Sequence, residues 1–175
     1  TLRTAFGLVA QDQFLFSDTV SANIRFGRPE VSEDEVRRMA EISTIHRDVS
    51  AFPQGYNTIV GERGVTLSGG QKQRVAISRA VITDPEILVM DDSLSAVDTE
   101  TEERILDHLR EVRADRITIL ISHRVSTLSN ADRIYVMDDG EIVESGTHRE
   151  LVQRGGFYAQ TWEHQRLEDS IGAVQ

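Results

Sequence analysis

Three short apolar segments end in polar side chains that could carry chemistry. The segments 6–10, 87–90 and 117–121 are followed by Gln11, by Asp91-Asp92 and by Ser122-His123. If the segments are parallel strands, their carboxyl ends meet at one edge, which is where open α/β sheets bind ligands. The sequence therefore predicts a site that combines an amide, a carboxylate pair and an imidazole.

The carboxylate pair is the candidate for metal chemistry. A hard cation such as Mg²⁺ prefers oxygen ligands and keeps several waters, so Asp91 and substrate phosphates suit it. Asp92 is then the candidate general base or water-orienting group. His123 can contact a phosphate or relay a proton, because imidazole exchanges protons near neutral pH. Taken singly, the pair can also cap a strand, and His123 and Gln11 can be structural.

The segment Leu67-Ser68-Gly69-Gly70-Gln71 is the candidate phosphate site. Ser68 and Gln71 are spaced as a capping box at a helix start. Two glycines in a first turn cost roughly 1 kcal/mol each relative to alanine, which favours a close approach of another group to the backbone. Helix N-termini bind anions through their free N–H groups and dipole. Alone, the segment is equally compatible with a glycine-rich helix start.

The expected elements define an α/β fold. Strands are predicted at 6–10, 86–90, 117–121, 133–137 and 141–144, and helices at 30–45, 68–82, 99–113, from 147 and at 157–168. Capping boxes are predicted for Ser32 with Glu35, Thr99 with Glu102, and Thr147 with Glu150. The apolar runs 86–90 and 117–121 are typical of strands buried on both faces. From residue 86 onward, the alternation of strands and helices favours a mainly parallel sheet. A helical insertion is expected before this region.

Composition narrows the function classes. The chain has 175 residues, a formal net charge of −10 and no Cys, which excludes disulfides and Cys-ligated metals. A net acidic chain argues against nucleic acid as a partner. The single lysine, Lys72, lies between Gln71 and Gln73, so the sequence contains no Gly-Lys-Ser/Thr P-loop. No apolar run approaches the roughly 18 residues that span a bilayer.

Taken jointly, the motifs resemble those of ABC-transporter ATPase domains over residues 2–168. Residues 67–71 resemble the signature motif, 87–92 the Walker B strand, 95–98 the D-loop, His123 the switch histidine and Gln11 the Q-loop glutamine. The resemblance implies a P-loop NTPase-like (RecA-like) α/β fold that lacks its N-terminal part. It implies four segments: the core end with the Q-loop (1–17), a helical subdomain (18–82), the ATPase core (83–155) and a C-terminal helix and tail (156–175).

The resemblance also implies roles for these residues, with ATP and Mg²⁺ as cofactors. Gln11 and Asp91 would hold the metal, and Asp92, His123 and Gln11 would serve catalysis. Residues Leu67, Ser68, Gly69, Gly70 and Gln71 would clamp nucleotide bound to a second ATPase domain, and Asp98 would communicate across that dimer. Hydrolysis would be in-line attack by water, promoted by positioning and electrostatics.

Further segments resemble the exporter type of the family. These are residues 13–17, 23–27, 61–64 and the run from His123 to His148. The resemblance implies a transmembrane domain as partner, contacted by residues 61–64, and a location at the cytoplasmic face of the membrane. It implies that ATP-driven dimerisation powers substrate efflux.

Two departures from the family pattern shape the functional hypothesis. The Walker A segment is absent and is expected upstream of Thr1, so that the fragment alone is expected to be inactive. Asp92 stands where the family usually has Glu, and its shorter side chain can cost on the order of 10²-fold in rate. Two hypotheses follow: the chain is half of an asymmetric exporter pair, or it is a nucleotide-gated interaction module without turnover. A DNA-repair or cohesin-type ATPase head would require coiled-coil arms, and 18–66 contains no heptad run.

Overall fold

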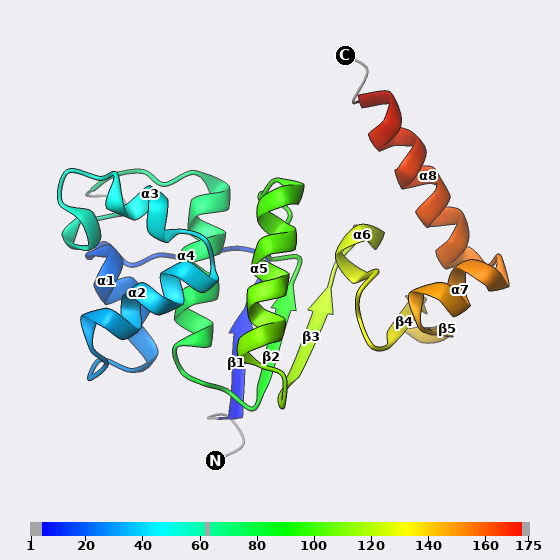
Figure 1. Cartoon of the computed structure of the whole chain (residues 1–175), viewed down its shortest axis with the longest axis horizontal. Coiled ribbons are helices and arrows are strands. Elements are labelled where there is room, and N and C mark those ends of the chain that lie inside the picture. Colours follow the sequence, from blue (N-terminus) through cyan, green and yellow to red (C-terminus); the bar gives the residue numbers. More distant parts are fainter. Residues whose placement is uncertain (1–4, 62–63, 173–175) are drawn as a thin grey trace. The chain divides into compact units, whose positions relative to one another are not determined.

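The chain forms two compact units, residues 1–121 and 122–175, in the computed structural model (Figure 1). The structure describes residues 5–61 and 64–172. In the first unit, the strands are β1 (Phe6–Val9), β2 (Ile87–Asp91) and β3 (Ile117–Ile121). Its helices are α1 (Val20–Ile24), η2 (Arg25–Gly27), α2 (Glu33–Ile42), α3 (His46–Ser50), η3 (Gly55–Asn57), α4 (Gly69–Val81) and α5 (Thr99–Val112).

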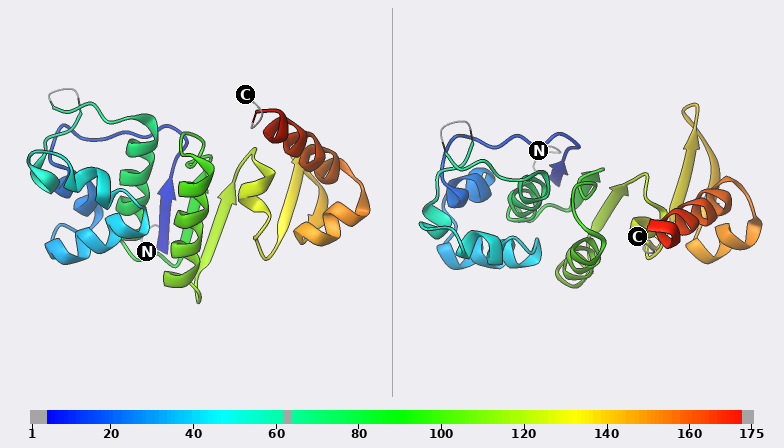
Figure 2. Two further views of the ribbon diagram at one scale, coloured as in Figure 1. Left: turned by 45° about the horizontal axis from the view of Figure 1, so that its top comes forward. Right: turned by 90° about the horizontal axis from the view of Figure 1, so that it is seen from above.

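The three strands of the first unit form a parallel sheet in the order β1-β2-β3. Figure 2 shows α4 and α5 on one side of this sheet. The register pairs Leu8 with Val89 and Val89 with Ile119. Because β1 and β3 both run parallel to β2, the carboxyl ends of all three strands lie at the same edge, as the sequence predicts.

The two faces of this sheet differ in exposure. Val9, Leu88 and Met90 are buried on one face. On the other, Leu8, Ile117, Ile119 and Ile121 remain 45–65% exposed. The prediction that β3 is buried on both faces is therefore wrong for this chain, because helices cover only one face of the sheet in the part that the structure describes. The uncovered face is nevertheless apolar.

The cap residues fix where the helices of the first unit begin. α4 has the predicted capping box of Ser68 with Gln71. α2 begins after Ser32, whose hydroxyl accepts the Glu35 N–H, and spans 33–42 instead of the expected 30–45. The expected Thr99 box is wrong: Asp98 caps α5 by accepting the Thr101 N–H. Aspartate one residue earlier takes the capping role because its carboxylate accepts a first-turn N–H, as preferred N-cap residues do.

The second unit is built on a hairpin and three helices. Its elements are α6 (Val125–Leu128), β4 (Ile134–Asp138), β5 (Glu141–Gly146), α7 (His148–Arg154) and α8 (Phe157–Gly172). The antiparallel pair β4-β5 turns through Asp139 and Gly140, which both have positive φ as a two-residue hairpin turn requires. The predicted Thr147–Glu150 capping box starts α7. The predicted hairpin and both helices are thus confirmed.

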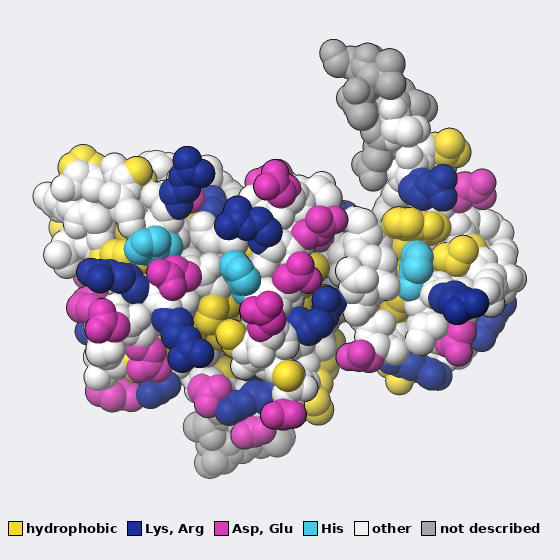
Figure 3. Space-filling view, in the orientation of Figure 1, with side chains coloured by type: hydrophobic (Ala, Val, Ile, Leu, Met, Phe, Trp, Pro, Cys, Tyr) yellow, Lys and Arg dark blue, Asp and Glu magenta, His cyan; other side chains and the backbone are white. Residues whose placement is uncertain are grey.

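The surface of the first unit carries mixed charge on the face drawn in Figure 3, where basic and acidic side chains alternate over the region of α2 and α5. On α2, for example, Arg37 lies next to Asp34. Among the helices of the described residues, none is both long and apolar enough to cross a membrane.

Candidate functional site

The start of α4 presents an open helix terminus. Leu67 is buried and anchors the segment, whereas Ser68 and Gly69 are exposed. The Gln71 N–H donates to the Ser68 Oγ at 3.2 Å, and the Ser68 N–H donates to the Gln71 Oε1 at 3.0 Å. Gly69 and Gly70 lie in the first turn, where amides have no intrahelical acceptor. The geometry suits an anionic oxygen approaching the exposed backbone.

Asp48 of α3 holds this helix start in place. Its Oδ1 accepts from the Gln71 Nε2 at 2.9 Å, and its Oδ2 accepts from the Arg74 Nη1 at 2.9 Å. Burial raises the pKa of Asp48, but the hydrogen bonds from Gln71 and Arg74 and the charge of Arg74 outweigh it and lower that pKa below its usual value. The helical subdomain thereby fixes the capping glutamine.

The glycine pair lies directly against residues 95–98. A Cβ at position 70 would lie 2.6 Å from the Ala96 carbonyl oxygen, and one at position 69 would lie 3.3 Å from the Ala96 Cβ. Both glycines therefore permit a close approach that larger residues would obstruct. In the same segment, Asp98 is exposed, and its hydrogen bond from Thr101 lowers its pKa. The structure thus brings segments 67–71 and 95–98 into contact.

The carboxylate pair lies at the end of β2. Asp91 is the last residue of the strand, and Asp92 leaves it with a φ of +43° while its N–H donates to the Ile121 carbonyl at 2.9 Å. Both residues are half-buried. Gln11 is exposed and follows β1 at the same sheet edge, because Val9 pairs with Met90. Gln11 and the pair therefore share an edge, as the sequence predicts.

His123 belongs to the second unit. His123 is exposed. Gln165 of α8 holds the backbone around it, since its Nε2 donates to the His123 carbonyl at 2.7 Å and its Oε1 accepts from the Val125 N–H at 2.8 Å. Ser122 adds a local contact by accepting the Arg124 N–H at 3.0 Å. The histidine thus lies in a loop that a distant helix positions.

The donor set fits a magnesium ion that is shared with phosphate. Within residues 5–61 and 64–172, no group of three or more His, Cys, Asp or Glu side chains could hold a metal by itself. Asp91 and Gln11 offer oxygen donors at one edge. Mg²⁺ is usually held by one or two carboxylates together with water and substrate phosphates, so these residues fit its chemistry.

Sequence reasoning missed the side chains that position the site. These are Asp48, Gln73, Arg74 and Gln165. Gln73 carried a recognisable signal, because it shares a helix face with the buried residues Ile77 and Ala80. A polar side chain at such a position needs a hydrogen-bond partner. Asp48 and Gln165 hydrogen-bond to groups that lie 23 and 42 residues away in the sequence, respectively. The spacing of residues alone does not reveal such contacts.

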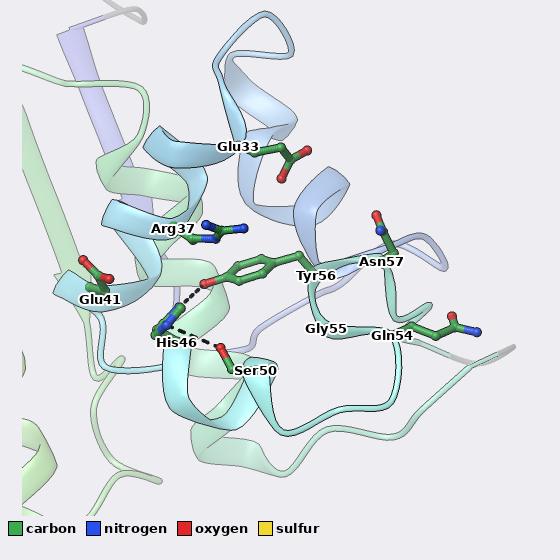
Figure 4. Close-up of a pocket in the computed structure, with 9 residues that line it drawn as sticks. All are labelled: Glu33, Arg37, Glu41, His46, Ser50, Gln54, Gly55, Tyr56 and Asn57. Atoms are coloured by element: carbon green, nitrogen blue, oxygen red, sulfur yellow. Dashed lines mark hydrogen bonds between the residues drawn. The ribbon is translucent and has the colours of Figure 1, made fainter.

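A separate cavity of about 730 Å³ lies between α2, α3 and η3 (Figure 4). Its lining includes Arg37, His46, Ser50 and Tyr56, and none of the predicted site residues. The Tyr56 hydroxyl lies 2.7 Å from the His46 Nδ1, and burial raises the pKa of Tyr56 to about 12. The phenol therefore stays protonated and can donate to the imidazole.

The predicted contact loop for a membrane domain, residues 61–64, lies partly outside the described residues. Glu62 and Arg63 are the two residues concerned. Gly61 before them has a φ of +98°, a conformation that L side chains rarely adopt. Glycine therefore suits the point where the chain enters this loop.

Comparisons with known proteins identify relatives over almost the whole chain. A family model described as ABC transporter matches residues 1–95. The ATP-binding cassette sub-family B member 6 of Homo sapiens is 49% identical over 169 residues, which cover 97% of this chain and 20% of that protein. The multidrug resistance-like ATP-binding protein MdlA of Buchnera aphidicola is 45% identical over 170 residues, covering 97% and 29% respectively.

A solved structure gives the same result in three dimensions. The structure of a bacterial Atm1-family ABC exporter with ATP bound superposes with a TM-score of 0.88 at 47% identity. The match covers 94% of this chain and 29% of that one. The chain thus spans between a fifth and a third of the length of these relatives. With this agreement of family, sequence and fold, the chain belongs to the ABC transporter family, as an exporter-type ATP-binding domain with a P-loop NTPase fold.

Proposed function

We propose that the chain is the ATP-binding part of an exporter that moves its substrate by nucleotide-driven dimerisation of two such domains. The observation that carries this proposal is the exposed start of α4 packed on segment 95–98. An anion-binding helix terminus at the surface can act on nucleotide that a second domain presents. The bound ATP would supply the phosphates, with Mg²⁺ neutralising their charge.

Each site residue has a role in this proposal. Ser68, Gly69 and Gly70 bind the terminal phosphate of the partner's nucleotide, while Leu67 and Gln71 hold that segment. Asp98 communicates with the partner. Asp91 and Gln11 ligate the metal, Asp92 orients the attacking water, and His123 contacts the terminal phosphate of the chain's own nucleotide.

The apolar sheet face suggests where the missing P-loop belongs. Leu8, Ile117, Ile119 and Ile121 are exposed on one face, and burying large aliphatic side chains stabilises a fold by about 1.5–3 kcal/mol each. We propose that a segment outside this sequence, carrying the P-loop lysine, covers this face. The four sequence segments 1–17, 18–82, 83–155 and 156–175 remain our proposed division of the domain.

An aromatic cluster is the proposed contact with the transmembrane domain. Phe14, Phe16 and Phe26 are 37–69% exposed, and the Phe16 and Phe26 rings stack with centroids 4.4 Å apart. The Arg79 guanidinium lies 5.5 Å from the Phe16 centroid. Exposed apolar patches of this kind are typical of protein interfaces. Together with residues 61–64, the cluster would couple the domain to its membrane partner at the cytoplasmic face.

The proposed asymmetry rests on position 92. Aspartate is one methylene shorter than the usual glutamate, so its carboxylate falls short of the attacking water. The chain's own nucleotide site would then turn over slowly, whereas its α4 start would complete a faster site on a different partner. If the chain's own nucleotide site does not hydrolyse ATP at all, the chain corresponds to the alternative of a nucleotide-gated interaction module.

The test uses ATP hydrolysis by the full-length exporter pair. Ser68→Ala is expected to lower kcat on the order of 10²-fold, because it disables the faster site. Asp92→Asn is expected to leave most of the turnover intact. Equal losses from both variants would contradict the asymmetry, and a wild-type pair that does not hydrolyse ATP would contradict the proposed function itself.

A further inference from the structure

Gln73 is a buried polar side chain in the core of the first unit. It lies one turn after Gly69 and Gly70 on α4, and its relative exposure is 5%. Burying an amide is unfavourable unless its polar atoms are hydrogen-bonded. Both ends of this amide find partners in one loop: the Nε2 donates to the Ser95 Oγ at 3.2 Å, and the Oε1 accepts from the Ala96 N–H at 3.0 Å.

The contact continues to the carboxylate pair. The Ser95 hydroxyl donates to the Asp92 carbonyl at 2.8 Å. A chain of hydrogen bonds therefore runs from the Gln73 amide through Ser95 to the backbone of Asp92. That backbone has a φ of +43°, a region in which L residues are held only by their surroundings.

The same loop also lies against the glycine pair. Ala96 is the residue that a Cβ at position 70 would meet at 2.6 Å. Ala96 thus contacts the first turn of α4 through its carbonyl and the next turn through its N–H. Two successive turns of one helix fix this loop, and Gln73 supplies the directional bonds.

We propose that Gln73 is a positioning residue that sets the geometry between the α4 start and the carboxylate pair Asp91-Asp92. This inference rests on the proposed function, in which the α4 start serves the partner's nucleotide and the carboxylates serve the chain's own. Gln73 then holds the chain's two half-sites at a fixed separation. Its amide touches neither nucleotide, and it acts through Ser95 and Ala96.

The decisive variant is Gln73→Glu in the full-length exporter pair. Glutamate keeps the oxygen that accepts the Ala96 N–H but loses the donor to Ser95. The Ser95 hydroxyl is then drawn from the Asp92 carbonyl to the new carboxylate. We expect kcat to fall roughly 10- to 100-fold, as displacement of site groups by about 1 Å does, with the KM for ATP unchanged. Gln153→Glu, the same change on an exposed residue of α7, should leave both constants at wild-type values.

A double-mutant cycle separates positioning from general damage. Ser95→Ala removes the bond to Asp92 and leaves the Gln73 contact to Ala96. Because both changes break the same chain of bonds, Gln73→Glu combined with Ser95→Ala should lower kcat no further than Gln73→Glu alone. The Ser95→Ala single variant preserves the test if Gln73→Glu fails to fold, because it must also lower kcat at constant KM.

Three results would overturn the inference. They are a wild-type kcat in either single variant, losses of kcat that multiply in the double variant, and a rise in the KM for ATP that accounts for the loss of activity. A wild-type pair that hydrolyses ATP but shows one of these results refutes the role of Gln73 alone. A wild-type pair without hydrolysis refutes the proposed function and this inference with it.

Discussion

At the residue scale, the backbone at position 92 favours a short side chain. Its φ of +43° lies in the left-handed region, which Asp and Asn tolerate better than other L residues because their short polar groups bond locally. Glutamate lacks this advantage. The residue that suits this turn thus also has a carboxylate that extends less far from the backbone than that of glutamate.

Exchanging Asp92 for Glu therefore has two opposite effects. In the full-length pair, we expect Asp92→Glu to raise turnover at the chain's own site on the order of 10²-fold, and to lower the free energy of unfolding by about 1 kcal/mol. Asp92→Asn is the matched control, which keeps the stability and gains no activity. ATPase assays and thermal unfolding measure both quantities. If Asp92→Glu gains no activity, the reach of the carboxylate does not limit hydrolysis.

At the scale of elements, α3 and α4 depend on one ionised side chain. Asp48 accepts hydrogen bonds from Gln71 and Arg74, and Arg74 also donates to the Thr44 carbonyl at 3.0 Å. Thr44 has a φ of +61° and follows Ser43, the C-cap of α2. Three consecutive helices of the subdomain thus converge on the capped start of α4, so their packing sets the direction of its first turn.

This connection predicts an acid-sensitive contribution to stability. Since the folded-state pKa of Asp48 is lowered below 3.8, its contribution is present above the unfolded pKa and is lost as the pH falls through the folded one. The stability difference between wild type and Asp48→Asn should be present at about pH 6 and shrink below about pH 4. Thermal unfolding across this range measures it, with exposed Asp34→Asn as control. A difference independent of pH would contradict a role for the Asp48 charge.

At the scale of the whole molecule, the first unit carries an apolar sheet face without a cover among the described residues. Leu8 is 65% exposed and Ile119 is 45% exposed, and the two lie on either side of Val89, with which both pair. Contiguous exposed apolar surface promotes association. This uncovered face is therefore expected to promote self-association of the chain.

The combined variant Leu8→Ser and Ile119→Ser should have opposite effects in the two contexts. In the isolated chain it should reduce self-association in sedimentation velocity, because less apolar surface is exposed. In the full-length protein it should lower stability by about 1.5–3 kcal/mol for each side chain that becomes buried there. Leu167→Ser, on the exposed surface of α8, is the control. If the stability of the full-length protein is unchanged, nothing covers this face there.

Local patterns in the sequence determined much of the fold. The capping boxes at Ser68 and Thr147 and the Asp139-Gly140 turn depend on neighbours within a few residues, so spacing alone predicts them. The apolar runs predicted the parallel strands, although their pairing joins residues far apart in the sequence, such as Phe6 with Ile87. The motif resemblance likewise indicated the family that the comparisons identify. The roles of Gln11, Asp91, Asp92 and His123 stay predictions.

Contacts between distant segments were decided by the tertiary structure alone. The partners of Gln73 lie 22 and 23 residues away, and those of Gln165 lie 40 and 42 residues away. The exposure of β3 could also not be predicted from the sequence, because an apolar strand has the same sequence pattern whether or not another segment covers it. The hydrophobicity of a residue indicates that its side chain can be buried, whereas only the packing of the chain decides which groups contact it.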